Sequence, residues 1–194
     1  MSDYLHPGYA LIVVWIAWVI SWFAAALWSS RVAARPPIAQ EIPNRLFTIA
    51  GAVLMTGRIH FPGWPQLWAY DDLKAWIALA ILICGVAFTW WARITLGALW
   101  SGDVTRKEDH RIVDTGPYGI VRHPIYTGIL AGIWGTAYFL GRYECFLGAL
   151  LMTIGFWLKA RLEERFLVAG LGEAAYADYK RRVPMLLPLA KGWG

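Results

Sequence analysis

Two long apolar runs restrict this chain to folds in which helices cross a membrane. Residues 9–28 contain no charged side chain and are interrupted by the hydroxyl of Ser21, and residues 73–96 form a second long run. At about 1.5 Å per residue, a helix of about twenty residues matches the roughly 30 Å hydrocarbon core of a bilayer. Both runs are therefore predicted to be transmembrane helices.

Three shorter apolar runs cover residues 46–57, 125–140 and 146–158. The first fits either a crossing helix or a re-entrant segment, because the run is short and Thr48 and Gly51 lower its hydrophobicity. The other two are joined by a short polar link, which predicts an antiparallel helical hairpin. The expected fold class is an all-α, polytopic membrane protein with about five transmembrane helices.

Glycines on both arms of this hairpin predict that its two helices lie close together, because small residues let helices approach each other in lipid. These glycines are Gly128, Gly132 and Gly135 on the first arm and Gly148 and Gly155 on the second.

Composition supports a membrane location and argues against nucleic acid as a partner. Hydrophobic residues make up 58% of the chain and charged residues 16%, whereas soluble domains average roughly 45–50% and about 25%. Thirteen tryptophans suit the membrane–water interface. The net charge of +5 comes from basic residues between apolar runs, a placement typical of contacts with lipid headgroups. We expect no nucleic-acid partner and no metal site.

The basic residues also predict the orientation of the chain. With five crossings and the N-terminus outside, fifteen of the eighteen lysines and arginines fall in segments on the inner side of the membrane. Cytoplasmic segments carry such an excess of positive charge. The polar stretch 101–123 and the tail from Lys159 onward are therefore expected to face the cytoplasm.

One candidate site segment leads into the predicted hairpin. Gly116 and Pro117 predict a turn, Pro124 suits the first turn of a helix, and His123 stands at its entrance beside Arg122. Tyr126 follows about one turn later, so the side chains of His123 and Tyr126 face one small volume at the membrane surface. A histidine that is merely hydrogen-bonded at the interface is the alternative interpretation.

A second candidate segment, Glu163 and Glu164, lies just beyond the final apolar run. Lys159 precedes Glu163 by four residues, so a helix extension with ion pairs is the alternative to a ligand site. A hairpin returns the chain to the side that it left, which predicts that these carboxylates lie near His123. Residues 174–182 are then expected to form a short amphipathic helix, with Tyr176 and Tyr179 on one side, that anchors on the membrane surface.

These motifs together resemble the isoprenylcysteine carboxyl methyltransferase family and the wider group that contains phospholipid N-methyltransferases. The resemblance covers about residues 97–188. It implies that S-adenosylmethionine binds in a cleft between the last two helices and the tail. It also implies two sets of site residues. The catalytic residues would be Arg122, Arg161 and Glu164, and the cofactor-binding residues would be Ile112, Val113, Tyr118, His123, Tyr126, Glu163 and Glu164.

In this view the chain is a single membrane methyltransferase domain, residues 1–194, in which residues 1–96 supply membrane helices and residues 97–194 bind the cofactor. The resemblance implies methyl transfer to a lipophilic acceptor from the bilayer, foremost the carboxylate of an isoprenylcysteine-like molecule, with Arg93, Arg122 or Arg161 to orient it. A phospholipid headgroup amine is the first alternative. A reductase that uses NADPH and a non-catalytic scaffold are the others. A bacterial inner membrane is the expected location.

Overall fold

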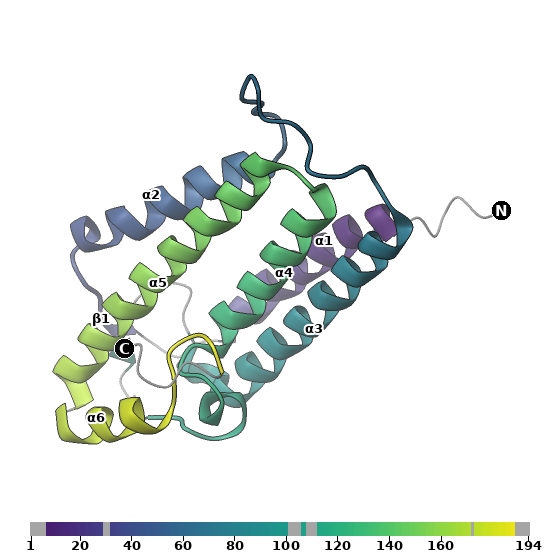
Figure 1. The fold of residues 1–194 in the computed structure, drawn as a ribbon. Helices are drawn as coiled ribbons and strands as arrows, with labels where there is room; N and C mark the ends of the chain where they lie inside the picture. The colour runs from purple at the N-terminus through teal and green to yellow at the C-terminus, as the bar shows by residue number, and fades with distance from the viewer. Residues whose placement is uncertain (1–6, 29–31, 101–105, 108–111, 172, 189–194) are drawn as a thin grey trace.

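The computed structural model describes residues 7–28, 32–100, 106–107, 112–171 and 173–188. In that part of the chain, five long helices lie side by side and a short sixth helix crosses one end of the bundle (Figure 1). The helices are α1 (Pro7–Ala26), α2 (Ile38–Met55), α3 (Asp72–Leu96), α4 (Pro124–Leu140), α5 (Tyr143–Leu171) and α6 (Glu173–Arg182). The all-α prediction is confirmed. Each predicted apolar run lies wholly or mostly within one of the five long helices.

A small antiparallel ribbon was not predicted. The strands β1 (Val32–Ala34) and β2 (Arg106–Lys107) pair with each other at the end of the bundle that carries α6. The ribbon joins the α1–α2 connection to the polar stretch after α3. The rest of that stretch, residues 101–105 and 108–111, lies outside the described residues.

Helices pack in two close pairs, α2 with α5 and α3 with α4, and α1 lies against α3 (Figure 1). Glycines sit at both crossings. A Cβ atom added at Gly51 would lie 2.5 Å from the carbonyl oxygen of Gly148, and one added at Gly85 would lie 2.5 Å from the carbonyl oxygen of Gly128. Only glycine permits such close approach of two backbones.

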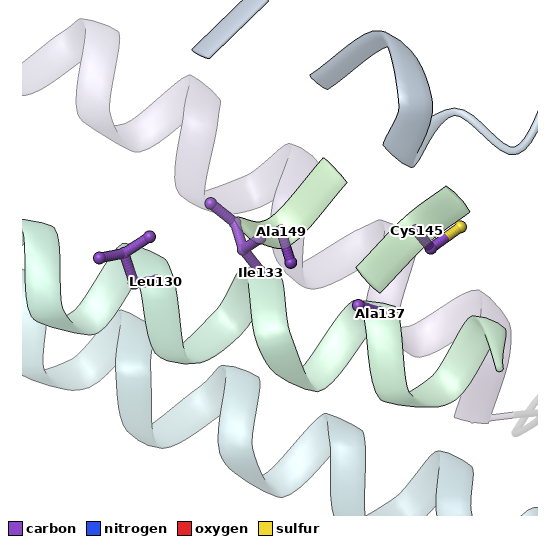
Figure 2. Close-up of a cluster of buried hydrophobic side chains, with 5 residues drawn as sticks. All are labelled: Leu130, Ile133, Ala137, Cys145 and Ala149. Atoms are coloured by element: carbon purple, nitrogen blue, oxygen red, sulfur yellow. The ribbon is translucent and has the colours of Figure 1, made fainter. Parts of the chain in front are cut away.

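The prediction that glycines join the two arms of the hairpin is therefore wrong. The glycines of α4 face α1 or α3 and those of α5 face α2. The contact between the arms is instead a cluster of buried apolar side chains (Figure 2). These are Leu130, Ile133 and Ala137 of α4 with Cys145 and Ala149 of α5.

The helix α2 is one continuous helix that runs along the bundle antiparallel to α5. Its Gly51 lies on Gly148 near the start of α5, whereas Asn44, two turns earlier, lies on Gly155. Among the described residues, three helices are long and apolar enough to span a membrane, namely Pro7–Ala26, Asp72–Leu99 and Tyr143–Ala169. Outer faces of the helices carry exposed apolar side chains, as expected for surfaces in contact with lipid.

The two ends of the bundle differ in character. At one end, the loop between α2 and α3 meets the α4–α5 link: Leu67 N donates to Gly141 O at 2.7 Å and Trp68 Nε1 donates to Tyr138 O at 3.1 Å. The other end holds the C-termini of α3 and α5, the N-terminus of α4, and α6 (Figure 1). Both predicted site segments therefore lie at this second end.

Candidate active site

The structure brings the two polar segments together where α4 begins and α5 nears its end. Arg122 Nε donates to Glu164 Oε1 at 2.7 Å, and His123 Nε2 lies 3.1 Å from the same oxygen. Glu164 is 2% exposed and Arg122 is 5% exposed. The hairpin α4–α5 accounts for this proximity, because its two open ends must lie side by side.

His123 lies between two carboxylates. Its Nε2 faces Glu164 and its Nδ1 lies 3.4 Å from Glu163 Oε2. A neutral imidazole has one N–H, whereas both ring nitrogens here face acceptors, which favours the doubly protonated ring. Burial opposes this charge, but the hydrogen bonds and charges of Glu163 and Glu164 outweigh burial and raise the pKa of His123 above its ordinary value.

Arg122 holds the C-terminal segment against the entrance of α4. Its Nη1 donates to the carbonyl oxygens of Val183 at 2.6 Å and Lys180 at 3.2 Å. The backbone N–H of Arg122 donates to Pro184 O at 2.8 Å. The guanidinium thus bonds to both Glu164 and the tail, and it holds these two segments together within the site.

Tyr126 and Glu163 extend the cluster toward the membrane. The Tyr126 hydroxyl donates to Glu163, and its ring stacks on the His123 ring with centroids 5.5 Å apart and an interplanar angle of 2°. Lys159 Nζ lies 5.4 Å from the centroid of the Tyr126 ring. Positions 159 and 163 are one helical turn apart, so the lysine is the cation on the membrane side of Glu163.

The residues predicted to lie along the nucleoside sit beside this cluster. Tyr118 is buried with Ala92, Trp100 and Ile125, and Val113 packs against that group. Ile112 packs against the tyrosines of α6. Desolvation raises the pKa of the Tyr118 hydroxyl well above its ordinary value, so Tyr118 stays neutral and presents an apolar ring with one polar tip.

The helix α6 is part of the site. The sequence had suggested a helix that anchors on the membrane surface, but its tyrosines do not face that surface. Tyr176 and Tyr179 are 3% and 4% exposed, and the Tyr179 hydroxyl donates to Tyr118 O at 2.8 Å. Sequence reasoning missed Lys180, whose Nζ lies 3.2 Å from Glu164 Oε2. The signal was present, because Tyr176, Lys180 and Val183 share one helical face.

Two arginines that the sequence offered for catalysis or for orienting a carboxylate lie outside the cluster around Glu163 and Glu164. Arg161 is exposed, and its guanidinium stacks on the Trp157 ring at 4.9 Å. Positions two apart on a helix point about 200° apart, which turns Arg161 away from the face of Glu163.

Arg93 is fully buried at the end of α3. It donates to the carbonyl oxygens of Ala25 and Trp28 at 2.7 and 2.5 Å and lies between the rings of Trp28 and Trp100. Its contacts tie the end of α1 to α3.

Comparison with known proteins identifies the family. The sequence model of the phospholipid methyltransferase family matches residues 73–174, which is more than half of the chain. The chain belongs to this family. The match runs from the start of α3 to the start of α6 and contains every site residue that the sequence predicted.

Two of the curated relatives of this family member carry different names. The chain is 33% identical over 118 residues to the protein-S-isoprenylcysteine O-methyltransferase of Schizosaccharomyces pombe, an alignment that covers 58% of this chain and 48% of the relative. It is 44% identical over 71 residues to methanethiol S-methyltransferase 2 of Bradyrhizobium diazoefficiens, covering 37% of this chain and 26% of the relative. The chain thus spans about half the length of the first of these relatives and about a quarter of the second.

A solved structure supports the fold. The eukaryotic intramembrane Ras methyltransferase ICMT (isoprenylcysteine carboxyl methyltransferase) is similar with a TM-score of 0.54 and 22% sequence identity. The similarity covers 77% of this chain and 53% of that protein. The helix bundle of this chain is therefore a fold that is also found in an intramembrane protein.

Proposed function

We propose that this chain is a membrane methyltransferase that uses S-adenosylmethionine as its methyl donor. The observation that carries the proposal is the buried cluster in which His123 lies between Glu163 and Glu164. The amino-acid portion of the donor has an ammonium and a carboxylate. Glu163 and Glu164 suit the ammonium, and the cations of His123 and Lys180 suit the carboxylate. The residues present therefore fit this cofactor.

The roles of the other residues follow from their positions. The backbone of Ile112 and Val113 and the ring of Tyr118 would bind the nucleoside, and Tyr126 would hold Glu163 in place. Arg122 would keep the tail closed over the site, which excludes water from the reacting atoms.

When bound, S-adenosylmethionine supplies a methyl group that is transferred in line from its sulfonium to an acceptor nucleophile. Such a displacement needs alignment more than proton transfer. The chain contributes by fixing the donor in the polar cluster at one end of the bundle. The acceptor would come from the bilayer, because the site lies at the ends of helices whose outer faces are apolar.

A lipophilic carboxylate of the isoprenylcysteine type is the acceptor that we favour, and Lys159 is the cation that would orient it. A phospholipid headgroup amine is the second candidate, in line with the name of the family. The excess of basic residues at the end that carries α6 favours a site that faces the cytoplasm, in a bacterial inner membrane. Residues 1–194 would form one domain, with the cofactor bound by residues 97–194.

Transfer of a labelled methyl group tests this function. Membranes that contain the protein are incubated with the labelled donor, and the label is followed. We expect label in a lipophilic product that is released by mild base, as an ester requires. Base-stable label in lipid would favour the headgroup amine. Absence of any label above that of membranes with a Glu164→Gln variant would contradict the proposal.

A further inference from the structure

A polar face of α2 is buried in the helix bundle, on the side that packs against α5. Glu41 and Asn44 are each 6% exposed, and they share one helical face with Thr48 and Gly51, at spacings of three and four residues. Burial of polar groups at membrane depth is costly, so such residues are rare outside functional sites. The α2 helix lies outside the residues matched by the family model, which are 73–174.

The packing of α2 on α5 leads this face into the candidate active site. Gly51 lies on Gly148, and the carbonyl oxygen of Asn44 would be 3.0 Å from a Cβ atom at Gly155. The two helices are antiparallel, so one further turn along this register places Glu41 opposite Lys159.

Glu41 lies in the first turn of α2, at the end of the helix that packs toward the cluster. In that cluster the Tyr126 hydroxyl donates its hydrogen bond to Glu163. Glu41 also pairs with Arg45, whose Nε lies 3.1 Å from Glu41 Oε2. Asn44 follows Glu41 by about one turn of α2, so it lies farther from the end of the bundle that holds the cluster. Gly155 precedes Glu163 by eight residues, or about 12 Å of helix.

The side-chain oxygen of Asn44 is unsatisfied. Oδ1 is buried and has no hydrogen-bond partner among the residues that the structure describes. Native proteins rarely leave a buried acceptor in this state, because the lost contact with water is not replaced. An N–H group of a bound molecule would supply the missing donor.

We propose that Asn44 determines acceptor specificity by accepting a hydrogen bond from an N–H group on, or next to, the group of a lipophilic acceptor that is methylated. The inference rests on the proposed function and narrows its acceptor to molecules with an amide or amine N–H. The cofactor cluster lies toward the end of the bundle and Asn44 lies toward its middle. An acceptor head group between them would present its reacting atom to the cofactor and its N–H to Asn44.

Two pairs of tail-matched probes test this proposal. S-farnesyl-N-acetylcysteine has an N–H that S-farnesylthiopropionate lacks, and phosphatidylethanolamine has an N–H that phosphatidylcholine lacks. Dissociation constants are measured on the purified full chain in detergent with saturating S-adenosylhomocysteine. In at least one pair, the N–H member should bind roughly three- to tenfold more tightly, the usual effect of one hydrogen bond. The pair that responds identifies whether the N–H belongs to a cysteine amide or to a headgroup.

Variants assign the preference to one side chain. Asn44→Leu, or Asn44→Ala if the leucine variant does not fold, should remove the preference and leave affinity for S-adenosylhomocysteine unchanged. Gln40→Leu changes an exposed amide of the same helix and should keep the preference.

The proposal is overturned if wild-type protein shows no preference in either pair, if it binds none of the four probes, or if the preference survives in Asn44→Leu. A protein that has the preference but transfers no methyl group would contradict the proposed function alone.

Discussion

The Nε2 atom of His123 lies 3.1 Å from Oε1 of Glu164, although the two residues are 41 positions apart in the chain. The same carboxylate contacts Arg122 at 2.7 Å and Lys180 at 3.2 Å. Three cations from two separate segments thus surround one buried glutamate. Glu164 thus holds together the entrance of α4, the end of α5 and α6. The balance of charges in this cluster should therefore affect both the stability of the protein and its binding of ligands.

Replacement of Arg122 by alanine should strongly destabilise the protein. The variant loses the ties to Val183 and Lys180 and leaves Glu164 with fewer cations around it. Removal of one partner of a buried ion pair typically costs about 3–5 kcal/mol. Thermal unfolding in detergent should show a lowered midpoint. Arg161→Ala is the matched control, since its exposed stacking on Trp157 contributes about 1 kcal/mol at most. Equal midpoints for the two variants would contradict the structural role of Arg122.

Protonation of His123 should make stability depend on pH. Its pKa is raised in the folded protein, whereas in the unfolded chain it is about 6.5. The stabilising contribution is therefore fully present below about pH 6.5 and is lost as pH rises through the folded pKa. The thermal unfolding midpoint of wild-type protein should therefore fall as the pH rises from about 6.5 through the folded pKa of His123. His123→Gln should fall less steeply, and an identical slope in the two proteins would count against the imidazolium.

The crossing of α3 and α4 should not accept a side chain at Gly85. A methyl group there would lie 2.5 Å from the carbonyl oxygen of Gly128, so the helices must separate. We expect Gly85→Ala to lower the free energy of unfolding by about 1–3 kcal/mol. Cys84→Ala, at the adjacent exposed position, should leave it unchanged. A neutral Gly85→Ala variant would mean that the helices cross farther apart than described.

Lys159, and not Arg161, should affect the acceptor. Lys159 lies over the Tyr126 ring beside the cluster, whereas Arg161 points away from it. If Lys159 orients an acceptor carboxylate, Lys159→Met should raise the KM for that acceptor about tenfold, the usual effect of a hydrogen bond to a charged group. Arg161→Ala should leave both kcat and KM unchanged. The opposite result for the two variants would restore the role that the sequence suggested for Arg161.

The sequence predicted the helices and their convergence because both follow from local patterns. Apolar runs fix where helices form, and the short link after Leu140 fixes the hairpin that brings His123 to Glu164. Partners of these helices were harder to predict. Glycine at Gly128 or Gly148 indicates a close crossing but not the helix that crosses it.

Side-chain partners were the other limit of the sequence. Arg122 carries a charge that suits a ligand, yet the tail takes up much of its hydrogen-bonding capacity. The apolar face of α6 fits either lipid or protein, and Tyr179 faces protein. These choices depend on contacts between distant segments, which spacing within one segment does not encode.

Binding of the methyl donor by the cluster around Glu164 is tested most directly by calorimetry on the purified protein in detergent. Wild-type protein should bind S-adenosylmethionine and S-adenosylhomocysteine, and Glu164→Gln and His123→Ala should each weaken binding about tenfold or more. Arg161→Ala should bind like the wild type. Binding of NADPH in place of both ligands, or unchanged affinity in both cluster variants, would contradict donor binding by this cluster.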